Sequence, residues 1–294
     1  MAPRILAIAN LKGGVGKSTS TMMIADRLAV LGYRVLVVDL DPQANLSYML
    51  LGRRAIDKYV AENRTLTQYL NDCFIQGQEK PLGTYVIQEA SDLDEQRKAG
   101  AGRVDLFSAT PRLRFVELAV EERFAQEKSS LHAAERAFEA KLREVIEYFS
   151  GHDVVIFDCP PGFTSLCRAA LRLADSGISP TVPDYISIMG LRDFSVFGLR
   201  LARDSVDRPL RHGVLFTKVE ARRDDMRSEI DALKADRRFR LLTSQIRQSR
   251  DAVRASERIR PDATRSFSEK YGGLRDSVKK LGDEVAAFIE LPER

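Results

Sequence analysis

Residues 10–19 of the chain, NLKGGVGKST, have the composition of a loop that binds phosphate groups. Glycines allow successive backbone N–H groups to turn toward an anion, and a helix that begins at Lys17 would add the positive end of its dipole. Lys17 would then reach the β- and γ-phosphates of ATP, while the Ser18 hydroxyl would hold Mg²⁺. The nucleotide-binding residues predicted from the loop itself are Gly13, Gly14, Val15, Gly16, Lys17, Ser18 and Thr19.

The same loop contains a second lysine, Lys12, ahead of Lys17. The ordinary phosphate-loop pattern has a glycine where this chain has Leu11, directly before Lys12. One lysine is enough for the phosphates of a single nucleotide. Lys12 is therefore either a solvated surface lysine or a residue whose task lies outside its own site.

Three aspartates follow apolar segments and predict a metal site. Asp158 ends the run DVVIFD, and Asp39 and Asp41 lie in VVDLDPQAN. Ligands of open α/β sheets bind at the carboxyl ends of the strands, where Asp158 would hold Mg²⁺, partly through water. One of Asp39 and Asp41 would contact the water shell of the metal and the other would orient the attacking water. The spacing leaves open which does which.

The elements around these residues alternate in the way that a parallel α/β sheet does. We predict one P-loop ATPase domain over residues 1–294, with a mostly parallel, twisted sheet flanked by helices. A polar stretch, 76–102, is predicted to be a surface excursion with one short strand, TYVIQEA, and 273–289 to be a C-terminal helix that packs on the sheet. The predicted strands are 4–10, 34–40, 103–109, 153–158, 176–182 and 212–217, and the predicted helices are 17–31, 112–124, 131–149, 165–174, 191–205 and 225–234.

Composition excludes several other classes of protein. With 44% hydrophobic and 30% charged residues, the chain is typical of a soluble globular protein. No apolar run has the roughly 18 residues of a transmembrane helix. The three cysteines form no C-x-x-C pair, which argues against disulfides and an iron–sulfur site and favours a reducing cytoplasm.

Positive charge gathers in one part of the chain. Residues 203–260 contain sixteen Lys or Arg and ten Asp or Glu, an excess of six against +4 for the whole chain. Such a region is either a solvated surface rich in ion pairs or a surface for a polyanion. Arg222, Arg223, Arg250 and Arg254 are the candidates for contact with DNA phosphates, which requires cations but carries no base information.

Together these segments resemble the ParA/MinD family of deviant-Walker ATPases, and the partition branch of ParA more than MinD. The resemblance covers nearly the whole chain and rests on KGGVGKST, VVDLDPQAN, FDCPPG, PTVPDYISIMGL, GVLFTKVEARR and IRQSRDAVRASE. The chain departs from the family at Arg247 or Gln248, where a proline near the adenine pocket is usual, and at Ala169, where an asparagine is common.

The resemblance implies roles for individual residues. Lys12 would cross a dimer interface to touch the nucleotide of the partner copy, Asp41 would be the switch aspartate of hydrolysis, and Asp39 the acid near the metal. Arg222 and Arg250 would contact DNA without sequence preference. Lys12, Lys17 and Asp41 are thus the predicted catalytic residues, and Ser18, Asp39 and Asp158 the predicted metal-binding residues.

The resemblance also implies a cycle. ATP would close a homodimer that binds nucleoid double-stranded DNA, and a ParB-like or cargo adaptor protein would stimulate hydrolysis and release it, in the cytoplasm and without a membrane. Because the chain begins almost directly at its first strand, no N-terminal helix-turn-helix and no operator-specific repression are expected. The alternatives are a MinD-like membrane-cycling ATPase, which needs a basic amphipathic C-terminus, and a metabolic P-loop enzyme, for which no further catalytic constellation is present.

Overall fold

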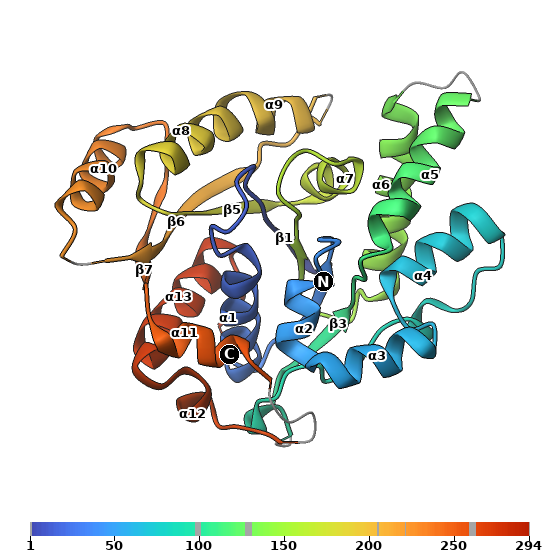
Figure 1. Cartoon of the computed structure of the whole chain (residues 1–294), viewed down its shortest axis with the longest axis horizontal. Helices are drawn as coiled ribbons and strands as arrows, with labels where there is room; N and C mark the ends of the chain where they lie inside the picture. Colours follow the sequence, from blue (N-terminus) through green and yellow to red (C-terminus); the bar gives the residue numbers. More distant parts are fainter. Residues whose placement is uncertain are drawn as a thin grey trace.

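A parallel sheet forms the centre of the molecule (Figure 1). It has seven strands, in the order β3-β2-β4-β1-β5-β6-β7. The computed structural model describes residues 2–97, 101–126, 131–204, 206–220, 222–258 and 263–293. The strands are β1 (Arg4–Ile8), β2 (Arg34–Asp39), β3 (Arg103–Phe107), β4 (Val154–Asp158), β5 (Ser176–Thr181), β6 (Arg211–Val219) and β7 (Leu241–Arg247).

Helices cover both faces of this sheet, as the nearly continuous apolar character of its central strands requires. Alternate residues of β4 divide between the two cores: Val154 and Ile156 pack with α1 and α13, and Val155 and Phe157 pack with α5, α6 and α7. The helices are α1 (Lys17–Val30), α2 (Asn45–Leu51), α3 (Arg53–Ala61), α4 (Leu66–Asn71), α5 (Leu113–Gln126), α6 (Leu131–Tyr148), α7 (Ser165–Leu173), α8 (Tyr185–Asp193), α9 (Leu199–Ala202), α10 (Asp224–Ala235), α11 (Arg250–Ser256), α12 (Phe267–Tyr271) and α13 (Arg275–Phe288).

The predicted parallel α/β architecture is confirmed, and each of the six predicted strands forms. Strand β7 was not predicted, because it lies at the edge of the sheet and only alternate residues of it are buried. Five short helices were not predicted either: α2, α3, α4, α11 and α12. The helix expected at 191–205 begins earlier, at Tyr185, because Asp184 caps it by accepting a hydrogen bond from the Ser187 N–H, at 2.9 Å.

The prediction of a surface excursion at 76–102 is wrong for its central part. Tyr85 and Val86 belong to one core and Ile87 to the other, and no strand forms over TYVIQEA. Ile87 instead makes an isolated antiparallel bridge to Leu106 of β3. Since β3 is an edge strand, this segment covers backbone groups that the edge would otherwise expose. Its apolar residues were too few to predict burial by periodicity. Lys98, Ala99 and Gly100 of the same prediction lie outside the described residues.

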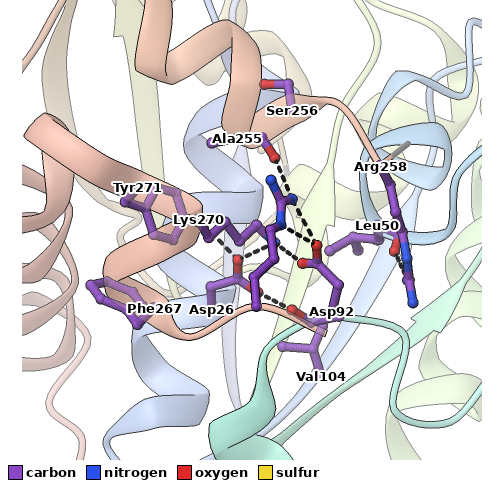
Figure 2. A network of polar contacts seen from close by, with 12 residues as sticks. Asp26, Leu50, Asp92, Val104, Ala255, Ser256, Arg258, Phe267, Lys270 and Tyr271 are labelled. Atoms are coloured by element: carbon purple, nitrogen blue, oxygen red, sulfur yellow. Dashed lines mark hydrogen bonds and ion pairs between the residues drawn. The ribbon is translucent and has the colours of Figure 1, made fainter. Parts of the chain in front are cut away.

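A buried ionic network ties this segment to the helix that follows the phosphate loop (Figure 2). The Lys270 Nζ, in α12, lies 2.7 Å from a carboxylate oxygen of Asp26 in α1 and 2.7 Å from one of Asp92. The Arg265 guanidinium forms a second ion pair with Asp92, at 2.7 Å, so the two acids face two cations. Burial raises the pKa of Asp92, but Lys270 and Arg265 outweigh it and hold that pKa below its ordinary value.

Helix α13 turns its apolar residues inward. Val278, Leu281 and Val285 have no exposed surface, and the helix packs against α1 and β7. Within the described residues, no helix has both the length and the apolar character needed to cross a bilayer.

Replacing Asp92 by Asn should destabilise the protein by about 3–5 kcal/mol at pH 7, because one partner of a buried ion pair is removed. An acid with a lowered folded-state pKa stabilises above its unfolded pKa, and the effect is lost as pH falls through the folded value. The difference between wild type and variant should therefore shrink toward pH 3. Urea unfolding at both pH values measures it, and an equal difference at both would contradict the role of the Asp92 charge.

Candidate nucleotide site

The loop between β1 and α1 has the backbone conformation of a phosphate-binding loop. Gly14 and Gly16 have φ values of +73° and +85°, in the left-handed region that favours glycine. Gly16 directly precedes the first residue of α1, so the unpaired N–H groups at the start of that helix face the loop. An anion in the loop would satisfy these donors and meet the positive end of the α1 dipole.

Lys17 is buried at the start of α1 and is held by its own loop. Its Nζ donates a hydrogen bond to the Lys12 carbonyl oxygen at 3.0 Å, and only 6% of the residue is exposed. Burial lowers the pKa of Lys17, although the charges of Asp158 and Asp41 oppose that shift. The ammonium group is thus a largely desolvated cation directed into the loop.

Two carboxylates lie side by side at the ends of neighbouring strands. Asp39 of β2 pairs in register with Asp158 of β4, and neither has any exposed surface. Both oxygens of Asp39 accept hydrogen bonds: one from the Asp41 N–H, and the other from the Ser47 N–H and hydroxyl. Burial raises the pKa of both acids, and the charge of Asp158 raises that of Asp39 further.

Asp158 differs from Asp39 in having an oxygen without a partner. Its Oδ1 accepts a hydrogen bond from the Thr21 hydroxyl at 2.9 Å, while its Oδ2 is buried and has no hydrogen-bond partner in the described part of the chain. The Ser18 hydroxyl lies close enough to interact with the same carboxylate. A hydroxyl and an unsatisfied carboxylate oxygen beside a phosphate loop are oxygen ligands of the kind that Mg²⁺ and its waters bind, so these residues fit that ion.

A cavity of about 420 Å³ opens over the loop. It is lined by Gly13, Lys17, Ser18, Thr19 and Asp41, among others. Burial raises the pKa of Asp41, against a hydrogen bond from the Gln43 N–H and the charge of Lys17. The structure therefore brings together the phosphate loop, Lys17, Ser18 and Asp41, as the sequence predicts.

A second cavity, of about 300 Å³, lies beside the first. Gly16, Thr19 and Lys218 line both cavities, so the two are neighbours across these residues. The wall on the far side comes from the end of β7 and from α11 and includes Arg247, Gln248 and Val253. The position at which the chain departs from its family thus faces this second cavity.

Lys12 does not line either cavity. Its Nζ donates a hydrogen bond to the Ser187 hydroxyl at 2.7 Å and lies 3.5 Å from an oxygen of Asp184, at the start of α8. Its side chain is still 37% exposed. In this single copy of the chain, Lys12 is bound to its own α8 and not to its own nucleotide cavity.

The four arginines proposed to contact DNA lie just beyond the carboxyl-terminal ends of β6 and β7. Val219 at the end of β6 pairs with Arg247 at the end of β7, and three residues after each of them come Arg222 and Arg250. All four candidates are exposed. Arg223 forms ion pairs with Asp225 and Glu220, whereas Arg222, Arg250 and Arg254 form none with the described residues.

Sequence reasoning missed several residues of the site. Thr21 bonds to Asp158, Ser47 bonds to Asp39, and the Thr217 hydroxyl donates to the Val15 carbonyl oxygen in the loop at 2.7 Å. Thr21 lies one helical turn after Lys17, so helical spacing was a usable signal. Ser47 and Thr217 reach the site from distant parts of the chain, and no local pattern marks them.

Comparisons with known proteins agree with this geometry. Residues 3–204 match the family model described as AAA domain. The chain is similar to the sporulation initiation inhibitor protein Soj of Bacillus subtilis, with 30% identity over 220 residues, which is 74% of each chain. It is also similar to the chromosome partitioning protein ParA of Caulobacter vibrioides, with 30% identity over 192 residues, which is 64% of this chain and 59% of that one.

A solved structure of a complex between ATP and a single-residue variant of McdA from Cyanothece has the same fold, with a TM-score of 0.70 at 19% identity, covering 97% of both chains. The matches with curated relatives span between 42 and 74% of the relatives' own lengths.

Replacing Asp158 by Asn should stabilise the ligand-free protein, because the amide keeps the shape of the side chain without its charge. A carboxyl group whose folded-state pKa is raised opposes folding more strongly as pH rises from its unfolded pKa to its folded one. A difference of one between the folded and unfolded pKa values corresponds to about 1.4 kcal/mol, so a gain of about 1–3 kcal/mol is expected at pH 8 and almost none near pH 4. Urea unfolding of both proteins checks this; a variant less stable at pH 8 would contradict the burial penalty.

Proposed function

Because the chain belongs to the ParA/MinD family of P-loop ATPases, we propose that it is a partition or positioning ATPase that works on DNA. ATP-bound copies form a sandwich dimer, the dimer binds double-stranded DNA without sequence preference, and a ParB-like or cargo adaptor stimulates hydrolysis and releases it. The cycle is a two-state switch in which the nucleotide selects the DNA-binding form. Such a protein acts in the cytoplasm, on the nucleoid.

The observation that carries the nucleotide part of this proposal is the buried, unpartnered Oδ2 of Asp158 beside the phosphate loop, in the part of the chain that the structure describes. Ser18 and Asp158 would hold Mg²⁺, which neutralises charge on the phosphates. Lys17 would bind the β- and γ-phosphates with an ammonium that burial has already desolvated. Asp39, whose oxygens are both occupied, would act by fixing the loop that carries Asp41.

Asp41 is suited to orient the attacking water. It lines the phosphate cavity, and the Gln43 N–H bonds to its Oδ1 at 2.9 Å, while no described residue donates to its Oδ2. The base of the nucleotide would occupy the second cavity, between the end of β7 and α11.

The position of Lys12 supports a role between two copies. Lys12 is outside its own cavities and is held by Ser187 and Asp184, near exposed apolar residues of α8 such as Tyr185 and Ile186, which are 67% and 70% exposed. A second copy that covers this surface would bring its nucleotide to Lys12. The lysine would then exchange its bonds with α8 for phosphate oxygens.

DNA binding is supported by the register of β6 and β7. Parallel strands that end together send their loops to the same side, so Arg222 and Arg250 leave the sheet from one edge. Arg222, Arg250 and Arg254 have no acidic partner in the described residues and are available for phosphates. Arg223 is already paired with Asp225 and is the weakest of the four candidates.

The membrane-cycling alternative is less well supported. A helix that binds a membrane surface must present its apolar side to lipid. The apolar residues of α13 are instead buried against α1 and β7. Co-sedimentation with anionic liposomes in the presence of ATP would revive this alternative.

The double variant Arg222→Glu with Arg250→Glu should lower the affinity of the ATP-bound protein for DNA by at least about tenfold and reduce the salt dependence of binding by about two phosphate contacts. Fluorescence anisotropy over a salt series measures both. Arg143→Glu, which removes an exposed arginine already paired with Glu139, is the matched control. DNA binding that is indifferent to ATP, or that survives the double change, would refute DNA as the partner.

Lys12→Ala should keep ATP binding within about threefold and lose most ATP-dependent dimer and turnover, because the lost ammonium serves the other copy. Light scattering after gel filtration, with and without ATP, reports the dimer. Lys17→Ala, which removes the lysine inside the cavity, should lose nucleotide binding itself. Unchanged dimerisation and turnover in Lys12→Ala would mean that Lys12 is only a surface lysine.

A further inference from the structure

Lys218 has an unusual backbone conformation at the end of β6. Its φ is +52°, in the left-handed region that non-glycine residues rarely adopt. The pairing of β6 with β7 shifts register on both sides of Phe216, as it does at a β-bulge. Bulges redirect a side chain, and strained backbone of this kind occurs at functional sites.

The residues on either side of Lys218 hold it in this conformation. The Thr217 hydroxyl donates to the Val15 carbonyl oxygen in the phosphate loop, and the Val219 carbonyl oxygen accepts from the Gln248 N–H at 3.1 Å. One bond ties the bulge to the phosphate loop and the other ties it to the wall of the second cavity. The position of Lys218 relative to both cavities is therefore set by direct contacts.

Lys218 lines both cavities, together with Gly16 and Thr19. Of these three shared residues, only Lys218 carries a charge. Its side chain is exposed and makes no ion pair or hydrogen bond with a described residue. A lysine whose side chain has no partner in the described chain thus lies at the junction between the phosphate cavity and its neighbour.

We propose that Lys218 binds the nucleotide at this junction, as a second cation after Lys17. Its ammonium would contact the α-phosphate and the side of the β-phosphate that faces the α-phosphate. The inference rests on the proposed function, because it assumes that ATP is the ligand. With the β- and γ-phosphates at Lys17 and the base in the second cavity, the α-phosphate lies between the two. A lysine is suited to this position, since it binds phosphate as a point charge without a fixed geometry.

Lys218 is also close in sequence to the proposed DNA surface. Lys218 is followed by Val219, Glu220 and the loop that carries Arg222. A nucleotide that neutralises Lys218 also fixes the bulge from which this loop begins. The alternative partner of an exposed lysine at this end of the sheet is a DNA phosphate. The experiment below distinguishes this partner from the nucleotide.

Three variants distinguish charge from backbone: Lys218→Met removes the ammonium, Lys218→Arg keeps a cation, and Lys218→Gly removes the ammonium and the strain together. Binding of a fluorescent ATP analogue and of the matching ADP analogue, with Mg²⁺ and without DNA, is the measurement. We expect Lys218→Met and Lys218→Gly to weaken the binding of both nucleotides about tenfold, because both nucleotides contain the α-phosphate. The affinity of Lys218→Arg should stay within about threefold of wild type.

Two controls complete the experiment. The unfolding temperature of ligand-free Lys218→Gly should equal or exceed that of wild type, because glycine adopts this φ without strain; weaker nucleotide binding in a protein of undiminished stability then reflects the lost charge. Arg143→Met, which removes an exposed cation that lines neither cavity and belongs to neither proposed surface, should leave nucleotide affinity unchanged.

Nucleotide affinities of Lys218→Met and Lys218→Gly within twofold of wild type would overturn the proposal. If fluorescence anisotropy then shows that the same variants lose only DNA affinity, Lys218 belongs to the DNA surface. Failure of the wild-type protein to bind ATP would instead refute the proposed function. Lys17→Ala should lose ATP binding whether or not Lys218 contributes to it. This variant therefore distinguishes failure of the Lys218 proposal from failure of the proposed function.

Discussion

The organisation of this protein follows from the burial of two carboxylates side by side. Asp39 and Asp158 end neighbouring parallel strands in register, without exposed surface, and their charges oppose one another. Such an arrangement is unfavourable unless hydrogen bonds and cations compensate for it. Ser47, Thr21 and the N–H of Asp41 supply the hydrogen bonds, Lys17 supplies a positive charge nearby, and one oxygen of Asp158 is left without a partner among the described residues. The site is therefore built to receive a further cation, and the phosphate loop beside it is built to receive an anion.

The parallel sheet brings the other parts of the site to the same edge. Strand ends β1, β2, β4 and β6 deliver the loop, the two acidic segments and the Thr217–Lys218 bulge, while β7 and α11 close the second cavity. The arginines proposed for DNA leave from β6 and β7 only a few residues beyond the nucleotide cavities. Only a few residues of the chain thus connect the nucleotide cavities to the loops that carry these arginines. The Asp26–Lys270–Asp92 network joins α1 to α12 and to the segment that covers the sheet edge, so the helix that begins at Lys17 is also held at Asp26 (Figure 2).

Lys12 and Lys218 have different surroundings in the folded chain. Lys12 lies outside both cavities and is bound by Ser187 and Asp184, so its proposed task depends on a second copy of the chain. Lys218 has no partner in the described residues and lies between the cavities of its own copy. The two side chains are chemically identical, so the distinction depends on which groups each ammonium meets in the folded chain.

Local patterns in the sequence determined the parallel α/β fold, six of the strands, the phosphate loop and the acids Asp39, Asp41 and Asp158, because strand hydrophobicity, glycine spacing and strand-end position are properties of short segments. The tertiary structure alone decided which of these acids keeps an unpaired oxygen within the described chain, where Lys12 is held, and that the 76–102 segment enters the core. It also decided the contacts of Ser47 and Thr217 and the position of Lys218 between the two cavities. These depend on contacts between residues far apart in the chain, and on register and burial, which no single segment encodes.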